Sequence, residues 1–196
     1  MKTSMAFVCG PFGLALAAFL MAGCQTGKEE CCTTESPTVT KTPETPRPTI
    51  RIKTGVSSPI TDSSGNVWLP DQGFADGDTI ERPELKIENT KDPAIYRAER
   101  YSMTAFSQKL PNGKYTVKLH FCETYEGITG VGQRVFSFNV EGKEFKDFDV
   151  WAKTGGAQRA YVETVNVDVT DGKLDIQFTP NVENPEINGI EIIPAS

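Results

Sequence analysis

The chain has 196 residues, five cysteines and a formal net charge of −6, which allows one ordinary domain with additional segments. An acidic protein repels phosphate backbones, so we expect no nucleic-acid partner. Only Cys122 falls within the probable domain, which excludes a disulfide inside that domain.

Residues 1–23 predict a secretory signal peptide rather than part of the folded domain. One positive charge, Lys2, precedes an apolar run over residues 5–21 that is short, contains Pro11 and ends in small residues. Such a run is typical of a cleaved signal and unlike a membrane span. Ala-Gly stands directly before Cys24, and this ending resembles a bacterial lipobox, in which the cysteine is lipidated and becomes the new N-terminus.

The lipobox resemblance implies a membrane partner through a lipid anchor on Cys24, in the bacterial cell envelope. Each buried CH₂ of an acyl chain contributes about 0.8 kcal/mol to membrane binding. Gln25 rather than Asp follows the cysteine, which favours the outer over the inner membrane by resemblance to lipoprotein sorting patterns. The alternative is an ordinary signal peptide cut near Gly23, with Cys24 incidental.

Residues 24–48 predict a disordered linker. They are rich in Thr, Pro, Glu, Lys and Ser and contain almost no large apolar side chain, so they cannot bury enough surface to offset the entropy of ordering. Their prolines favour extended conformations that hold a domain away from the membrane. Cys31 and Cys32 are adjacent in this segment, and the sequence leaves their role open. The folded domain is therefore expected over residues 49–196.

Within this domain, apolar and polar residues alternate with a period of two, which indicates β-strands. Turn signals of the Asn-Gly, Glu-Gly and Asp-Gly type separate the alternating runs. Several short strands with polar outward faces predict an all-β protein, an antiparallel β-sandwich of two packed sheets. The clearest runs are 115–121, 136–140, 165–169, 174–178 and 190–192.

Two tyrosines suggest a function. A sugar presents C–H faces, on which an aromatic ring stacks, and hydroxyls, to which a phenol can hydrogen-bond. Tyr101 is expected at the start of a strand, and Tyr125 in the loop after the strand that ends near residue 121. Binding sites are usually built on loops at one rim of a sandwich. By residue type alone, however, two tyrosines capping the edge of the core are the favoured interpretation.

Four segments, in their order and spacing, resemble the malectin family of carbohydrate-binding domains. They are DPAIYRAERY at 92–101, PNGKYTVKLHF at 111–121, GQRVF at 132–136 and NPEINGIEI at 184–192. The resemblance covers residues 51–193 and implies a jelly-roll-like β-sandwich with a glycan pocket at one end. It also implies sugar contacts from rim aromatics, matched by Tyr101 and Tyr125, and from an acid before the Asn-Pro pair, matched by Glu183.

Two positions depart from the family pattern. Glu126 stands where the family has an aromatic residue after the second tyrosine, and the upstream loop tyrosine falls near Thr79. Each lost stacking ring costs on the order of 0.5–1.5 kcal/mol beyond area burial. We therefore expect a neutral oligosaccharide or polysaccharide partner, with a specificity different from that of animal malectin. The predicted contacts are Tyr101, Tyr125, Glu126 and Glu183.

Several alternatives stay open from the sequence. Glu126 and Glu183 could form a glycosidase pair, but the family is non-catalytic, so we expect no enzyme. Arg100 and Arg134 could clamp an acidic sugar, although pairing with neighbouring acids is favoured. His120 has no metal-ligating companions and is expected to be structural. No metal or cofactor site is expected, and a structural calcium, which sandwiches of this type sometimes carry, stays open. A further hypothesis is an envelope lipoprotein that binds other proteins and carries a decayed sugar pocket.

Overall fold

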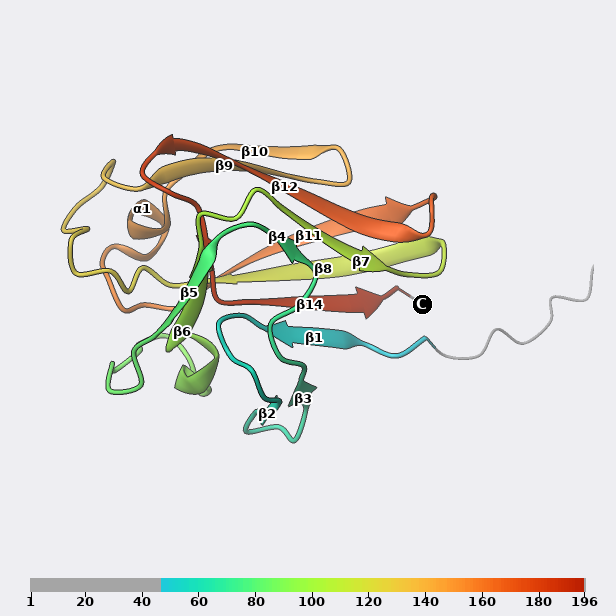
Figure 1. Ribbon diagram of the computed structural model, residues 1–196, viewed down its shortest axis with the longest axis horizontal. Helices are drawn as coiled ribbons and strands as arrows, with labels where there is room; N and C mark the ends of the chain where they lie inside the picture. The colour runs from blue at the N-terminus through green and yellow to red at the C-terminus, as the bar shows by residue number, and fades with distance from the viewer. Residues whose placement is uncertain (1–46, 196) are drawn as a thin grey trace, which may run out of the picture. The chain divides into compact units, whose positions relative to one another are not determined.

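Two antiparallel β-sheets form the body of the domain in this computed structural model, which describes residues 47–195 (Figure 1). One sheet has four strands in the order β1-β14-β8-β11, and the other has five in the order β10-β9-β12-β7-β4. The first contains β1 (Ile50–Lys53), β8 (Gly113–Phe121), β11 (Tyr161–Val169) and β14 (Gly189–Pro194). The second contains β4 (Phe74–Ala75), β7 (Ala105–Lys109), β9 (Val135–Val140), β10 (Lys143–Phe148) and β12 (Lys173–Val182). The predicted all-β antiparallel sandwich is confirmed.

The apolar residues of the alternating runs form the core between these two sheets. Val117 and Leu119 of β8 are fully buried against Phe136 of β9 and Ile176 of β12, in one hydrophobic core. The ring centroids of Phe121 and Phe136 lie 6.0 Å apart across the layers. Fully burying an apolar side chain of this size contributes roughly 1.5–3 kcal/mol, so this interior fixes which side chains face outward.

A smaller sheet in the order β13-β6-β5 lies at the end of the sandwich where β8 finishes and β14 begins (Figure 1). Its strands are β5 (Asp78–Glu81), β6 (Ala98–Tyr101) and β13 (Glu186–Ile187). The remaining elements are the hairpin of β2 (Ile60–Thr61) and β3 (Val67–Trp68), the 3-10 helix η1 (Pro93–Ile95) and the short helix α1 (Val150–Thr154). Because β6 is paired on both sides, the side chains that it carries to the end of the sandwich have a rigid base.

His120 packs beside this small sheet against Trp68 and Tyr96, which belong to a second hydrophobic cluster. These contacts indicate a structural role. Its Nδ1 atom lies 2.8 Å from the Tyr96 hydroxyl, and its Nε2 atom lies 3.1 Å from the Glu191 carboxylate. Its ring meets the Trp68 ring edge to face, with centroids 5.2 Å apart. Both ring nitrogens are therefore engaged within the fold.

Candidate functional site

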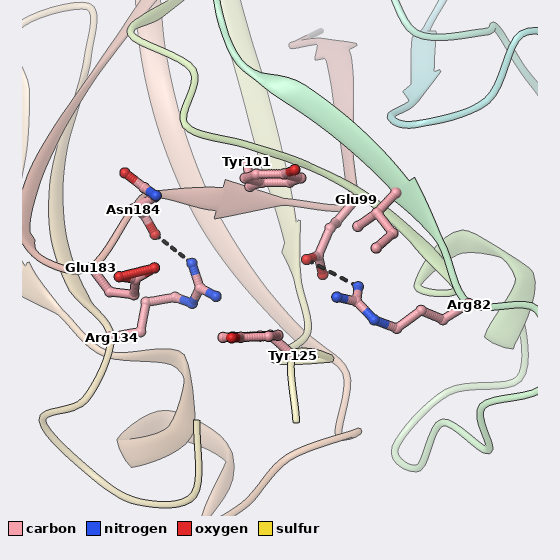
Figure 2. Close-up of a pocket in the computed structure, with 8 residues that line it drawn as sticks. Arg82, Glu99, Tyr101, Tyr125, Arg134, Glu183 and Asn184 are labelled. Atoms are coloured by element: carbon pink, nitrogen blue, oxygen red, sulfur yellow. Dashed lines mark hydrogen bonds and ion pairs between the residues drawn. The ribbon is translucent and has the colours of Figure 1, made fainter. Parts of the chain in front are cut away.

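Tyr101 and Tyr125 line one pocket at the end of the sandwich that carries the small sheet. Figure 2 shows their rings on opposite sides of this pocket, both seen nearly edge-on. The pocket has a volume of about 290 Å³, which is close to the lower end of ligand pockets, roughly 300–1,000 Å³. The expectation that Tyr101 starts a strand is wrong, because β6 begins at Ala98 and Tyr101 is its last residue.

Tyr125 stands in the loop after β8, and two hydrogen bonds within that loop hold its backbone. Its backbone N–H donates to the Glu123 carboxylate over 2.9 Å, and its carbonyl accepts from Ile128 over 3.1 Å. The ring lies directly against Gly127, where an added Cβ would come within 2.5–2.9 Å of three ring atoms. Only glycine leaves room for this ring position, which keeps Tyr125 44% exposed at the mouth of the pocket.

A buried ion pair on one side of the pocket connects two of the loops that line it. The Arg134 Nε atom donates to the Glu123 carboxylate over 2.7 Å. Arg134 Nη1 donates to the Asn184 carbonyl over 2.6 Å (Figure 2). Burial lowers the pKa of Arg134, but Glu123 and Glu186 more than offset this and leave the pKa above its usual value. The guanidinium is therefore charged, and it ties the Tyr125 loop to the loop after β12.

A second cation and carboxylate lie on the other side of the pocket. Arg82 Nη1 is 3.2 Å from the Glu99 carboxylate and donates to the Thr124 hydroxyl over 2.8 Å. The Thr124 hydroxyl in turn donates to Glu99. Figure 2 shows the Arg82–Glu99 pair and the Arg134 guanidinium flanking the space between the two rings. With Glu183, which also lines the pocket, the wall carries two positive and two negative side chains.

Three of the four predicted contact residues come together here. Tyr101, Tyr125 and Glu183 line the pocket, and Glu183 adopts a left-handed backbone with φ of 63° directly after β12. Glu126 does not join them: it is exposed in the turn beside Tyr125 and does not line the pocket. The Glu126 side chain therefore contributes nothing to the lining of the pocket.

The two other sequence positions of interest face elsewhere. Thr79 and Arg100 are paired neighbours on β5 and β6 and line a neighbouring cavity, which shares only Ile80 with the pocket. Arg100 Nε lies 3.1 Å from Asp71 rather than from any pocket carboxylate. Because adjacent residues of a strand point to opposite faces, Ile80 rather than Thr79 reaches the pocket.

The sequence did not identify four of the residues that line the pocket, namely Ile80, Arg82, Glu99 and Asn184. One of them had a usable signal: Glu99 is two residues before Tyr101, so their side chains leave the same face of β6. The sequence held no such signal for Arg82, because its contact with Glu99 depends on the path that the chain takes between residues 82 and 99.

A fully buried carboxyl group stands on the strand next to Tyr101. Glu186 pairs with Tyr101 in the small sheet, and neither of its carboxyl oxygens has a hydrogen bond of ordinary geometry to any residue described here. Burial raises the pKa of Glu186 well above its usual value, and Glu99 and Glu123 raise it further. Arg134 and the nearby Cys122 amide lower it only in part.

Residues 47–195 contain no group of His, Cys, Asp and Glu placed to hold a metal ion. None of the helices in this described part is long and apolar enough to cross a membrane. The free thiol of Cys122 is buried, and burial raises its pKa, which makes it unreactive. The signal peptide, the linker up to residue 46, and the predicted lipidation site Cys24 with Cys31 and Cys32 lie outside the described residues.

Residues 49–190 match the family model of the malectin domain, and the chain belongs to this family of non-catalytic carbohydrate-binding domains. Two curated relatives are receptor-like kinases of Arabidopsis thaliana. A probable leucine-rich repeat receptor-like serine/threonine-protein kinase is 37% identical over 104 residues, covering 48% of this chain and 10% of that protein. A probable receptor-like protein kinase is 35% identical over 109 residues, covering 45% and 13%. The match thus spans only about a tenth of such relatives.

Three solved structures share the fold at low sequence identity. The β-glucuronidase of Bacteroides uniformis has a TM-score of 0.69 at 20% identity, over 76% of this chain and 18% of that chain. The extracellular domain of ANXUR2 from Arabidopsis thaliana has 0.66 at 19% identity, over 75% and 48%. A chain from the complex of the plant peptide RALF23 with FER and LLG2 has 0.65 at 21% identity, over 74% and 48%. At such identities these likenesses show the fold alone.

Proposed function

We propose that this domain binds a neutral oligosaccharide in the pocket between Tyr101 and Tyr125, without catalysing a reaction. The observation that carries the proposal is the placement of the two rings on opposite sides of one pocket. Aromatic rings pack against the C–H faces of a sugar, and phenols bond its hydroxyls. Membership of the malectin domain family supports the same ligand class.

The charges of the pocket wall favour a neutral ligand over an acidic one. Arg82 is paired with Glu99, and Arg134 with the buried Glu123. A neutral sugar adds hydroxyl groups to these pairs without removing a charge from its partner. Glu99 and Glu183 would accept hydrogen bonds from hydroxyls, and the guanidinium groups would donate, with the extra strength of bonds to charged groups.

The placement of Glu126 weighs against glycoside hydrolysis by the pair considered from the sequence. Such an enzyme holds the bond that it cleaves between two carboxyl groups. Glu183 lines the pocket, but Glu126 does not, so a sugar held between the tyrosines would not lie between these two acids. Binding without cleavage is the function that we propose.

A glycan array probed with the protein tests this function. We expect hits among neutral glucans or mannans, with dissociation constants between about 1 µM and 1 mM, or roughly −8 to −4 kcal/mol. Tyr125→Ala should weaken those hits. An array without any neutral hit would contradict the proposal.

We also propose that a lipid on Cys24 anchors the protein in the bacterial cell envelope, with the outer membrane favoured. The support is the lipobox-like sequence that ends at Cys24. Metabolic labelling with a fatty acid should label the native protein, and Cys24→Ala should lose the label and leave the membrane fraction. A labelled or still membrane-bound variant would contradict this anchor.

A second candidate function is protein or peptide binding at the same rim. Ile80, Tyr125 and Val182 are exposed there, and such side chains also suit a protein partner. The RALF23 complex shows a structurally similar chain crystallised with a peptide. A pull-down from an envelope extract that recovers a defined protein, together with an array without hits, would favour this candidate.

A further inference from the structure

Buried ionisable side chains gather at the end of the sandwich that carries the pocket. An ionisable group in a protein interior is rare unless it is paired. Glu186 is the extreme case, because it is 0% exposed and neither of its carboxyl oxygens has a hydrogen bond of ordinary geometry to any of residues 47–195. The other members of this buried group are 0–5% exposed, namely Lys53, Glu99, Glu123 and Arg134.

Glu186 shares one face of the small sheet with two residues that line the pocket. It is the direct cross-strand neighbour of Tyr101, and Glu99 stands two residues before Tyr101 on β6. Directly paired residues, and residues two apart on one strand, carry their side chains on the same face of a sheet. The Glu186 carboxyl therefore lies on the face from which Glu99 and Tyr101 reach the pocket, although it does not line the pocket itself.

The surroundings of Glu186 favour its neutral form. Burial raises its pKa well above the usual value, and the carboxylates of Glu99 and Glu123 raise it further. Arg134 lowers the pKa of Glu186 in part, and in return Glu123 and Glu186 both raise the pKa of Arg134. The Arg134 guanidinium therefore lies in the field of two buried acids, and only Glu123 bonds it directly.

Two further titratable groups face Glu186. Burial raises the pKa of the Cys122 thiol, and Glu186 raises it further, so this thiol stays neutral. Burial lowers the pKa of Lys53 to about 7, and Glu186 is one of the acids that oppose this shift. The Lys53 ammonium donates to three backbone carbonyls, those of Thr54, Ala98 and Asn188. Loss of the Lys53 proton removes a cation near Glu186 and so opposes the ionisation of Glu186.

We propose that Glu186 is a positioning residue through which pH controls glycan binding: its neutral form leaves Arg134 to hold two rim loops, and its ionised form draws Arg134 away. This inference rests on the proposed function and adds regulation to the same pocket. With Glu186 neutral, Arg134 binds Glu123 and the Asn184 carbonyl, as Figure 2 shows for Asn184. An ionised Glu186 competes for the guanidinium, because a buried charge without a partner is costly. The bond to Asn184 is then lost, and the pocket wall loosens.

The direction of the pH effect follows from linkage between proton and glycan. The glycan binds the form with neutral Glu186 more tightly, so affinity is highest at low pH. It falls as the pH rises through the pKa of Glu186 in the folded protein. By reciprocity, a bound glycan raises the pKa of Glu186 further, and binding takes up protons from the solution.

Isothermal titration with maltotriose, cellotriose and mannotriose from about pH 5 to about pH 9 tests this inference. The native protein should bind at least about tenfold more weakly at the upper end, which corresponds to a rise of about one unit in the pKa of Glu186 on binding. Glu186→Gln keeps the size and cannot ionise, so its affinity should fall less than about threefold over the same range. Glu144→Gln, at a side chain that is 60% exposed, is the matched control and should follow the native curve.

A second readout uses the native protein alone and decides the question if Glu186→Gln does not fold. Titration in two buffers of different ionisation enthalpy should show net proton uptake on binding, with near-UV circular dichroism confirming the fold at each pH. Equal slopes for the native protein and Glu186→Gln, or binding without proton uptake, would overturn the inference. The proposed function would then stand, because the glycan still binds at low pH. Failure of all three glycans at every pH would overturn both together.

Discussion

The carboxylate of Glu123 and the guanidinium of Arg134 lie 2.7 Å apart in the interior, and each also bonds to a residue that lines the pocket. Glu123 accepts from the backbone of Tyr125, and Arg134 donates to the carbonyl of Asn184. One buried pair therefore sets the spacing of two rim loops that are far apart in the sequence.

Removing one member of this pair should destabilise the whole domain. Arg134→Leu leaves Glu123 buried without its cation, and breaking a buried pair in this way costs about 3–5 kcal/mol. Urea denaturation measures the free energy of unfolding. The double variant Glu123→Gln with Arg134→Leu should recover part of the loss, because no uncompensated charge remains. A single variant as stable as the native protein would show that the pair contributes nothing.

Tyr125 should matter for binding and little for folding. Its side chain is 44% exposed, so Tyr125→Ala should leave the melting temperature nearly unchanged. It should weaken glycan binding at least about twofold, since a stacking ring is worth about 0.5–1.5 kcal/mol beyond its buried area. Val67→Ala removes an exposed apolar side chain that does not line the pocket and serves as the control. Unchanged glycan affinity in Tyr125→Ala would contradict the assigned role.

Gly127 should act on binding through the ring of Tyr125. An alanine Cβ would come within 2.5–2.9 Å of that ring, so Gly127→Ala should displace the ring and weaken binding about as much as Tyr125→Ala. Gly130→Ala is the matched control in the same loop, where a Cβ meets only the Gln133 amide at 3.7 Å. Both variants are measured by titration with a monosaccharide ligand. Equal affinities for the two would show that the ring does not depend on Gly127.

The missing upstream aromatic should be restorable at Ile80 and not at Thr79. Ile80 lines both the pocket and the neighbouring cavity beside Arg100, whereas Thr79 lines only that cavity. Ile80→Tyr should therefore tighten glycan binding by roughly 2- to 12-fold, which corresponds to about 0.5–1.5 kcal/mol. Thr79→Tyr should leave it unchanged. The reverse order of effects would mean that β5 presents its other face to the ligand.

Stability should fall as the pH rises, because of Glu186. Its pKa in the folded protein lies well above the 4.5 of an exposed glutamate. The folded state therefore holds the proton over a range where the unfolded state has lost it, and the free energy of unfolding decreases from about pH 4.5 upward through the folded pKa. Each unit of difference in pKa is worth about 1.4 kcal/mol.

Glu186→Gln tests this pH dependence because a glutamine has the same size and does not titrate. Its free energy of unfolding should change less than that of the native protein between roughly pH 5 and 8. Glu144→Gln, at a side chain that is 60% exposed, should keep the native slope. Parallel slopes for Glu186→Gln and the native protein would show that Glu186 does not titrate in this range.

The sequence predicted the sandwich because alternation directly records which side chains face the core. The same rule places Glu99 beside Tyr101 and separates Ile80 from Thr79, but it works only when the strand boundaries are known. Tyr101 was expected at the start of a strand and lies at its end. The sequence therefore indicated two rim tyrosines without fixing which neighbours share their face.

The rest of the site depends on long-range contacts that leave no local pattern. Arg82 meets Glu99, and Arg134 meets Asn184, only because the small sheet and the loop after β12 close on the same end of the sandwich. The buried carboxyl of Glu186 was equally hidden, since in the sequence it is one acid in an Asn-Pro-Glu segment. Spacing alone could not show that Glu126 turns away from the pocket.

The most direct measurement is an NMR titration of protein with ¹³C-labelled tyrosine rings, using the neutral oligosaccharide that binds tightest on the array. The chain has five tyrosines, which keeps the ring signals assignable. The ring signals of Tyr101 and Tyr125 should shift together at one saturation point, while those of Tyr96, Tyr115 and Tyr161 stay in place. A bound glycan that shifts neither Tyr101 nor Tyr125, or only one of them, would contradict a ligand held between the two rings.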